Sequence, residues 1–406
     1  MKNLHVFTNK FPFDNSGEDT FLVPEMTILS MNFNIIFYVK NVDISHENIP
    51  FDYTICENIF YIKNNKVKLT WGLVMQTFKE ILYNPRLLKD PSKLRELMVI
   101  HSDNILNAKL FLNYFKTKNF HSSKDLFYTY WFEEWNIILS IAKKMNKIFN
   151  DFKLVSRAHN FDVYDYRSKY LKIPFRGTQL SYTDAVYCIS NDASTYLKSN
   201  NKSHVDKIHF RRLGVNQTKQ NDFKIDNDFV IVSCSAMVIQ KRIDKIIKVL
   251  SKVNRKVVWY HFGDGPLMSF YKSEVKFLKK NIFVKFMGFK SNKFILNFYA
   301  TNKISLFINL SDYEGIPVSI MEAISFSIPV IATNVGGVSE IVTKESGVLI
   351  EKDCNLNQLT TILNDFPNHD IFTSNFRAKV FNFSNNNFNA EKNFNDFSDD
   401  LLNLLN

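Results

Sequence analysis

Short apolar runs alternate with longer amphipathic stretches along most of this chain. The alternation predicts an α/β fold, because strands of a parallel sheet are buried on both faces while the connecting helices expose one face to water. The rhythm stops at a polar segment, 216–222, and then starts again. Two consecutive α/β domains satisfy this pattern, and 406 residues are too many for one compact core.

The pattern assigns five strands to each half of the chain. In the first half we expect strands at His5–Thr8, Asn34–Val39, Leu126–Tyr130, Lys153–Ala158 and Ala185–Ile189. In the second half we expect them at Phe229–Ser233, Lys256–Phe262, Ile282–Phe286, Ser305–Leu310 and Pro329–Ala332. Helices are expected at 74–115, with breaks near two prolines, and at Trp135–Phe149, Ala193–Ser199, Ile243–Val253 and Ser291–Tyr299. The resulting domains are 1–215 and 229–384, joined by a linker at 216–228 and followed by a closing helix at 385–406 that packs back on the first domain.

The net charge of +11 is unevenly distributed, since residues 1–217 hold 29 Lys and Arg against 21 Asp and Glu, a net charge of +8. A basic half suits a nucleic acid, an anionic membrane or an anionic substrate. No nucleic-acid-binding motif accompanies it, so we expect no nucleic-acid partner. One stretch of basic and apolar residues suits reversible attachment to an anionic inner leaflet. Its members are Lys79, Arg86, Lys89, Lys93 and Arg95, beside Phe78, Leu82, Leu87, Leu88 and Leu94.

The cysteines, the amino-terminal segment and the longest apolar runs indicate the cellular compartment. Cys56, Cys188, Cys234 and Cys354 are widely spaced and show no metal-ligand or disulfide pattern. The amino-terminal segment lacks the features of a signal peptide. No run approaches the roughly 20 apolar residues of a membrane-spanning helix. We therefore expect a cytoplasmic protein, attached peripherally at most to the inner face of the plasma membrane.

The passage Ser305–Ala323 carries the clearest chemical signal. A strand is followed by a loop, and Pro317 suits the first turn of the next helix, where its missing N–H costs nothing. The amides of Ile316, Val318 and Ser319 would then face a ligand together with the positive end of the helix dipole. Phosphate groups bind α/β sheets at such junctions.

Two carboxylates flank this junction. Gly315 allows a ligand to approach the backbone closely, and Glu314 is placed to accept hydrogen bonds from sugar hydroxyls. Glu322 lies about one and a half turns into the helix and is placed to reach the ribose of a nucleotide. A single glutamate in such a position is as readily a helix cap or a solvated side chain. The pair around a phosphate site predicts a nucleotide-sugar ligand.

The whole string from Glu314 through Gly315-Ile316-Pro317 and Glu322 to residues 327–342 resembles the signature of retaining glycosyltransferase family 4. The resemblance implies the GT-B fold, in which two Rossmann-like doubly wound domains face a central cleft. It also implies that the second domain binds the donor.

The segment 233–247 resembles the first strand and loop of that family's donor domain, where a lysine and an arginine neutralise the diphosphate. Lys241 matches the lysine. Ala236 stands where the arginine is usual, and Arg242 is the candidate for the second charge. The resemblance further implies donor contacts from Ser235, in the same loop, and from Phe289, in a loop that borders the base.

In the first half, 156–164 resembles a segment of bacterial exopolysaccharide, capsule and O-antigen transferases. This resemblance implies that His159 and Asp162 are catalytic residues, although a purely structural histidine stays open. The loop with Gly17 and Glu18 resembles the acceptor-facing loop of the same enzymes.

No metal or cofactor is expected. Asp226 and Asp228 form a triplet with Asn227 that holds divalent ions in another glycosyltransferase fold, but this triplet lies in the expected linker. Lys241, Arg242 and helix amides are instead expected to carry the diphosphate charge.

The sequence thus predicts a metal-independent glycosyltransferase. It would move a sugar with retention from a UDP-, GDP- or ADP-sugar to a glycan, in particular a lipid-linked one, in bacterial surface polysaccharide synthesis. Two alternatives stay open: a sugar-nucleotide epimerase of the same fold, and a non-catalytic basic protein that binds a membrane or nucleic acid.

Overall fold

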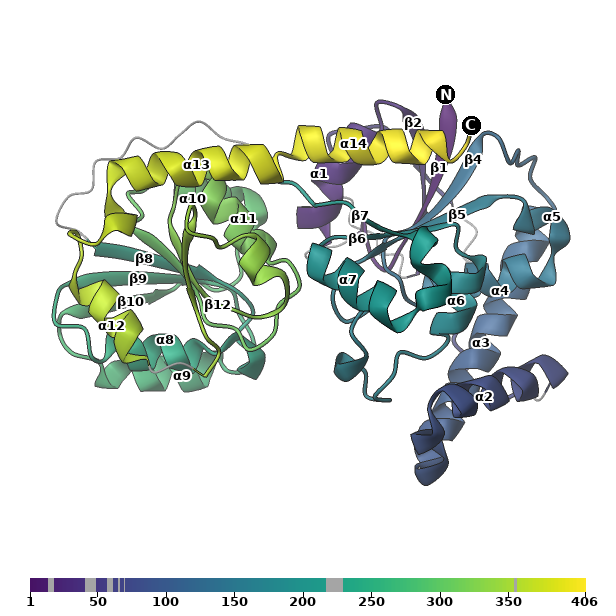
Figure 1. Cartoon of the computed structure of the whole chain (residues 1–406), viewed down its shortest axis with the longest axis horizontal. Helices are drawn as coiled ribbons and strands as arrows, with labels where there is room; N and C mark the ends of the chain where they lie inside the picture. The colour runs from purple at the N-terminus through teal and green to yellow at the C-terminus, as the bar shows by residue number, and fades with distance from the viewer. Residues whose placement is uncertain are drawn as a thin grey trace. The chain divides into compact units, whose positions relative to one another are not determined.

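The computed structural model describes residues 1–13, 18–40, 49–56, 61–64, 66–68, 70–216, 229–353 and 356–406. These residues form two compact units, one of Met1–Arg211 with Phe394–Asn406 and the other of Arg212–Asn393. Each unit holds one parallel β-sheet between helices (Figure 1). The expected linker, apart from its first residue, lies outside the described residues, as do Gly17, Asp226 and Asp228.

The first unit contains a seven-stranded parallel sheet in the order β3-β2-β1-β4-β5-β6-β7. The strand order reverses between β1 and β4, which is the doubly wound arrangement. The strands are β1 (Lys2–Thr8), β2 (Phe33–Val39), β3 (Tyr53–Ile55), β4 (Asp125–Thr129), β5 (Lys153–Ala158), β6 (Ala185–Cys188) and β7 (Ile208–Phe210). The helices are α1 (Asp19–Leu29), α2 (Trp71–Tyr83), α3 (Pro91–Phe115), α4 (Glu134–Met145), α5 (Lys147–Asn150), α6 (Arg176–Tyr182) and α7 (Asn191–Asn200).

Alternation along β1 explains how both faces of this sheet are covered. Leu4 and Val6 point to one face and pack in a cluster with α1. Phe7 points to the other face and packs with Phe111 of α3 and Ile138 of α4. Because successive side chains in a strand point to opposite faces, a continuous apolar strand requires helices on both sides.

The second unit contains a six-stranded parallel sheet in the order β10-β9-β8-β11-β12-β13. Its strands are β8 (Phe229–Cys234), β9 (Val257–Phe262), β10 (Ile282–Phe286), β11 (Leu306–Asn309), β12 (Val330–Thr333) and β13 (Gly347–Ile350). Its helices are α8 (Ile243–Leu250), α9 (Met268–Glu274), α10 (Asn292–Thr301), α11 (Val318–Ser325), α12 (Asn357–Asn364) and α13 (Ser374–Phe388). In Figure 1, α8, α9 and α12 cover one face, and α10, α11 and α13 cover the other.

The sequence located all ten expected strands, with small differences at their ends. The predicted breaks in 74–115 are also confirmed, since a 3₁₀ turn (Pro85–Lys89) and then α3 each begin at a proline. The Asp90 carboxylate accepts a hydrogen bond from the Lys93 amide at 3.1 Å and caps α3. The short edge strands β3, β7 and β13 were not predicted.

The last helix, α14 (Ala390–Asn403), brings Phe397 and Leu401 into the core of the first unit. The Phe397 ring centroid lies 3.8 Å from the Arg157 guanidinium carbon. Arg157 also donates to the Glu25 carboxylate at 2.9 Å, and both side chains are completely buried. The buried ion pair therefore connects β5, α1 and the C-terminal helix.

Substitution of Glu25 by Gln should lower the free energy of unfolding by about 3–5 kcal/mol, because it leaves the buried Arg157 charge without its counterion. Urea unfolding of the full chain measures this loss. The control is Glu96→Gln, which removes the ion pair of Glu96 with Lys169, whose side chains are 44% and 60% exposed. That change should cost less than about 1 kcal/mol. Equal losses in the two variants would contradict the role of the buried pair.

Candidate functional site

In the second unit, the loops that follow β8 and β11 contact each other. The Asp312 amide donates to the Gln240 carbonyl at 2.8 Å. Next to this contact, Lys241 Nζ lies 2.7 Å from Glu314 Oε1. The Glu314 side chain is only 8% exposed and also accepts a hydrogen bond from Asn309 Nδ2 at 3.2 Å. Lys241 and Glu314, which the sequence analysis assigned to the donor site on separate grounds, thus form a hydrogen-bonded ion pair.

The start of α11 presents free backbone amides. The helix begins at Val318, and Pro317 precedes it with ψ near 109°, so Pro317 is the N-cap and not, as predicted, part of the first turn. The Pro317 carbonyl accepts from the Ile320 amide at 3.0 Å, and none of the side chains that the structure describes caps this end. Because the first amides of a helix have no partner within it, those of Val318 and Ser319 remain available to an anion.

A glycine pair after β12, Gly336 and Gly337, packs against the backbone of the loop that contains Glu314 and Gly315. Gly336 has φ of +52°, and a Cβ there would lie 2.1 Å from the Glu314 carbonyl oxygen. Gly337 donates its amide to the Gly315 carbonyl at 3.0 Å. The site loop and the glycine loop are therefore in backbone contact, which a residue with a side chain would prevent.

Glu322 is buried rather than placed on a solvated helix face, since it is 5% exposed. Its Oε1 accepts a hydrogen bond from Asn292 Nδ2, at the start of α10. A buried carboxylate needs hydrogen-bond partners, and the Asn292 amide satisfies part of this need.

Arg242, the candidate for the arginine that Ala236 replaces, is held by two carboxylates. Its backbone is left-handed, with φ of +49°. Its guanidinium donates to Asp312 at 3.0 and 3.1 Å and to Asp244 at 2.9 Å. The hydrogen bonds that Arg242 donates to Asp244 and then to Asp312 raise the pKa of Arg242. Two carboxylates pair with this guanidinium in the free chain, and the role of Arg242 as the second positive charge stays a prediction.

The other two expected donor contacts lie after β8 and β10. The Ser235 carbonyl accepts from His261 Nε2 at 3.1 Å, and its amide donates to Phe262 at 2.9 Å. Gly263 makes this approach possible, because a Cβ at its φ of +129° would lie 1.9 Å from the Ser235 oxygen. Phe289 is 60% exposed and offers an aromatic surface.

In the first unit, His159 and Asp162 form a compact turn after β5. The Asp162 carboxylate accepts from the His159 amide at 2.7 Å and from the Phe132 amide at 3.0 Å. Its Oδ2 thus joins the loop after β5 to the loop after β4, and its Oδ1 closes its own turn. Burial lowers the pKa of His159 to about 3, and its neutral ring donates from Nε2 to the Tyr130 carbonyl at 3.0 Å.

Glu18 performs a similar bracing function after β1. Its Oε2 accepts from the amides of Lys10 and Phe11 at 3.0 and 2.9 Å. Its Oε1 accepts from Trp131 Nε1 at 2.7 Å. The Trp131 ring lies 4.3 Å from the His159 ring between centroids. Glu18 and His159 therefore belong to one packed group.

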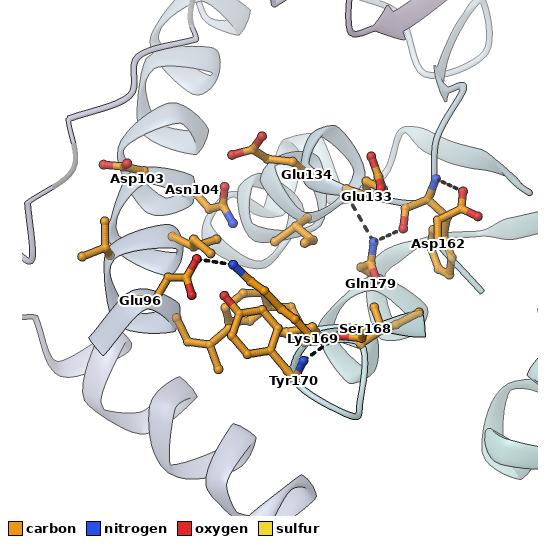
Figure 2. Close-up of a pocket in the computed structure, with 18 of the residues that line it drawn as sticks. Glu96, Asp103, Asn104, Glu133, Glu134, Asp162, Ser168, Lys169, Tyr170 and Gln179 are labelled. Atoms are coloured by element: carbon orange, nitrogen blue, oxygen red, sulfur yellow. Dashed lines mark hydrogen bonds and ion pairs between the residues drawn. The ribbon is translucent and has the colours of Figure 1, made fainter. Parts of the chain in front are cut away.

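A pocket of about 530 Å³ opens beside this group, wholly within the first unit. Figure 2 shows carboxylates, amides and Tyr170 arranged around it. Its wall includes Phe161, Asp162 and residues of α3. Of this wall the sequence analysis singled out only Asp162, because the other lining residues come from widely separated segments of the chain.

Asn104 of α3 is the most informative residue of the pocket wall. It is fully buried, and neither its Nδ2 nor its Oδ1 has a hydrogen-bond partner among the described residues. Figure 2 shows its amide directed into the pocket. An unpaired buried amide costs about 1–3 kcal/mol, which a polar ligand would recover.

Two neighbouring glutamates add acceptors to the same wall. Burial, followed by the nearby Asp162 carboxylate, raises the pKa of Glu133 to about 7. Glu134 accepts from Lys40 Nζ and from Tyr61 Oη, each at 2.9 Å. Amides, carboxylates and aromatic rings in one pocket provide the groups that bind hydroxyl-rich ligands.

Comparisons with known proteins agree with this arrangement. Residues 215–379 match the family model described as Glycosyl transferases group 1. The chain is 28% identical over 158 residues to poly(ribitol-phosphate) alpha-N-acetylglucosaminyltransferase of Staphylococcus aureus, a match that covers 37% of this chain and 31% of that protein. It is 30% identical over 179 residues to an uncharacterized glycosyltransferase of Methanocaldococcus jannaschii, covering 42% and 46% of the two chains. The matches therefore span less than half the length of these curated relatives.

The similarity in structure extends over both units. The crystal structure of HepE from Anabaena, solved in complex with UDP, aligns with a TM-score of 0.65 and 14% identity over 99% of each chain. Together with the two doubly wound sheets, this alignment shows that the chain has the GT-B fold. Its second unit is similar to glycosyltransferase group 1 domains.

Substitution of Gly336 by Ala should destabilise the second unit by about 1–3 kcal/mol, because the new Cβ meets the Glu314 backbone at a left-handed φ. Gly177→Ala is the matched control, since among the described residues no atom lies within 4 Å of a Cβ there. Because Gly177 lies in α6, that change should be neutral or stabilising by up to about 1 kcal/mol. Thermal unfolding measures both. Full stability of the Gly336 variant would show that the two loops separate without cost.

Proposed function

We propose that this protein is a retaining glycosyltransferase of family 4 that transfers a sugar from a nucleotide-sugar donor to a cell-surface glycan. The observation that carries the proposal is the Lys241–Glu314 pair at the uncapped start of α11, inside the segment that matches the group 1 family model. A cation, free amides and a carboxylate at one junction suit a diphosphate joined to a sugar.

In the proposed reaction, the bond between the anomeric carbon and the diphosphate oxygen breaks. The acceptor hydroxyl forms the new bond on the same face of the sugar, and its proton passes to the departing diphosphate oxygen. Lys241 and the amides of Val318 and Ser319 stabilise the negative charge that develops on this oxygen. Glu314 binds sugar hydroxyls, and Glu322 binds the ribose. No metal ion takes part in this mechanism.

We further propose that the pocket beside Asn104 binds the acceptor. The named activity of the Staphylococcus relative, addition of N-acetylglucosamine to poly(ribitol phosphate), supports a glycan of the cell surface. A lipid-linked glycan of a capsule or O-antigen is the acceptor we propose, reached from the cytoplasm. UDP-sugars are the first donors to test, because HepE was solved with UDP.

Lys241→Ala should weaken binding of UDP much more than binding of uridine, because only the diphosphate uses its charge. Glu314→Gln and Glu322→Gln should each lower kcat/KM by about tenfold or more, as expected for lost hydrogen bonds to a charged group. Calorimetry measures binding, and acceptor-dependent release of UDP measures activity. Both assays are run in excess EDTA.

Arg242→Ala is the control for Lys241, because Asp244 and Asp312 already pair with its guanidinium. We expect diphosphate affinity to change less than about threefold, in line with an exposed ion pair. Equal loss of uridine and UDP affinity in the Lys241 variant would contradict the diphosphate role. UDP release without acceptor would favour an epimerase, and activity that requires a divalent ion would overturn the metal-free mechanism.

Asn104→Leu should have opposite effects on stability and function. Removal of the unpaired amide should raise the free energy of unfolding by about 1 kcal/mol, while loss of its hydrogen bonds should raise the acceptor KM about tenfold. The control is Asn107→Leu on the same helix. Asn107 is equally buried, but its amide exchanges hydrogen bonds with the Ile62 backbone at 2.8 and 3.0 Å.

The Asn107 variant should therefore lose stability. Thermal unfolding and initial rates at varied acceptor concentration separate the two substitutions. An unchanged acceptor KM in the Asn104 variant would remove this pocket from the acceptor site, and it would leave the donor assignment intact.

A further inference from the structure

Helix α2 carries a stripe of exposed apolar side chains. Their spacing of three or four residues places them on one face of the helix. They are Trp71, Val74, Met75, Phe78 and Leu82, which are 77%, 40%, 41%, 56% and 64% exposed. Scattered exposed apolar residues are ordinary, but a continuous stripe with a tryptophan marks an interaction surface.

The opposite face of α2, which packs on the protein, buries one apolar residue, Leu73, and two polar ones. Gln76 and Glu80 are 5% and 7% exposed. Gln76 Nε2 donates to Glu80 Oε1 at 2.8 Å, and Glu80 Oε2 accepts from the Phe175 amide at 3.1 Å. A typical surface helix turns its apolar side to the core and its polar side to water. In α2 this polarity is reversed, since most of its apolar side chains are exposed and two polar ones are buried.

Positive charge surrounds the stripe. The segment 61–95 contains eight Lys and Arg but only two Asp and Glu, and one of these acids is the buried Glu80. Lys79, Arg86 and Lys89 are exposed beside the stripe. The sequence pattern had placed the apolar surface at 78–95, but Leu87 is 3% exposed, so the apolar surface instead begins at Trp71.

We propose that the apolar stripe of α2 inserts into the surface of an anionic lipid bilayer. Trp, Phe and Leu on one side with Lys and Arg around them is the composition of interfacial helices. Within the described residues, no helix has both the length and the apolar character to cross a bilayer, so α2 would lie in the interface plane.

Charge selects the bilayer over a second copy of the chain. A two-fold interface places the same patch on both partners. The stripe would then bring two sets of lysines and arginines together, and like charges at close range repel. An anionic leaflet instead accepts the apolar side chains and attracts the basic ones.

The test measures co-sedimentation of the full chain with phosphatidylcholine vesicles, with and without phosphatidylglycerol, at low and high salt. Binding should require the anionic lipid and weaken with salt. The triple variant Trp71→Ser, Phe78→Ser, Leu82→Ser should lower the partition coefficient by about tenfold or more, because each side chain contributes buried apolar area. Ile148→Ser, at a position 69% exposed in the same unit, is the matched control and should bind as the native protein does.

Trp71 fluorescence provides a second measurement that does not depend on the triple variant. Emission of the native protein should shift to the blue when anionic vesicles are added, and Trp71→Phe should bind without this shift. Binding without a Trp71 shift, equal binding to neutral vesicles, or equal loss in the Ile148 variant would overturn the proposal. A dimer in sedimentation equilibrium that the triple variant abolishes would assign the stripe to a second copy instead. None of these outcomes depends on glycosyl transfer.

Discussion

The parallel direction of every strand in both sheets determines where chemistry can occur in this protein. Parallel strands bring all their carboxyl ends to one edge, so residues from distant parts of the sequence meet there. In the second unit, Lys241 follows β8 and Glu314 follows β11, and these are neighbouring strands. Their 2.7 Å contact is therefore a consequence of sheet order. The same rule places Glu18 and His159 of the first unit after β1 and β5.

Close backbone packing explains why a long motif was more informative than its individual residues. The two glutamates are ordinary residues at ordinary spacing. The glycine pair at 336–337 adds a condition, because its loop contacts the Glu314 and Gly315 backbone. The two glutamates and the glycine pair together therefore define one loop conformation, which neither pair defines alone.

The sequence predicted the architecture and the loops that bring Lys241 and Glu314 together, because apolar periodicity and backbone requirements are local. It could not show contacts between distant residues. Arg242 looked like a replacement for the arginine missing at Ala236, but Asp244 and Asp312 bind it. The Asp162 carboxylate accepts two backbone amides, a bracing role that its motif did not reveal. Asn104 carries no signal in the sequence, since only the fold shows that its buried amide is unpaired.

The inverted helix α2 and the pocket share structural elements, which connects the two proposals. Glu80 of α2 accepts from the Phe175 amide, and Asn84 at the end of α2 donates to the Tyr170 carbonyl at 2.6 Å. Phe175 and Tyr170 both line the pocket beside Asn104. Polar residues of α2 therefore hold the pocket wall, while its exposed apolar face remains available for the proposed lipid contact. A helix that packed its apolar face on the protein could not serve both purposes. Under these two proposals, an acceptor anchored in a bilayer would meet this pocket beside α2, and the polarity of one helix would account for both the proposed attachment and the proposed acceptor class.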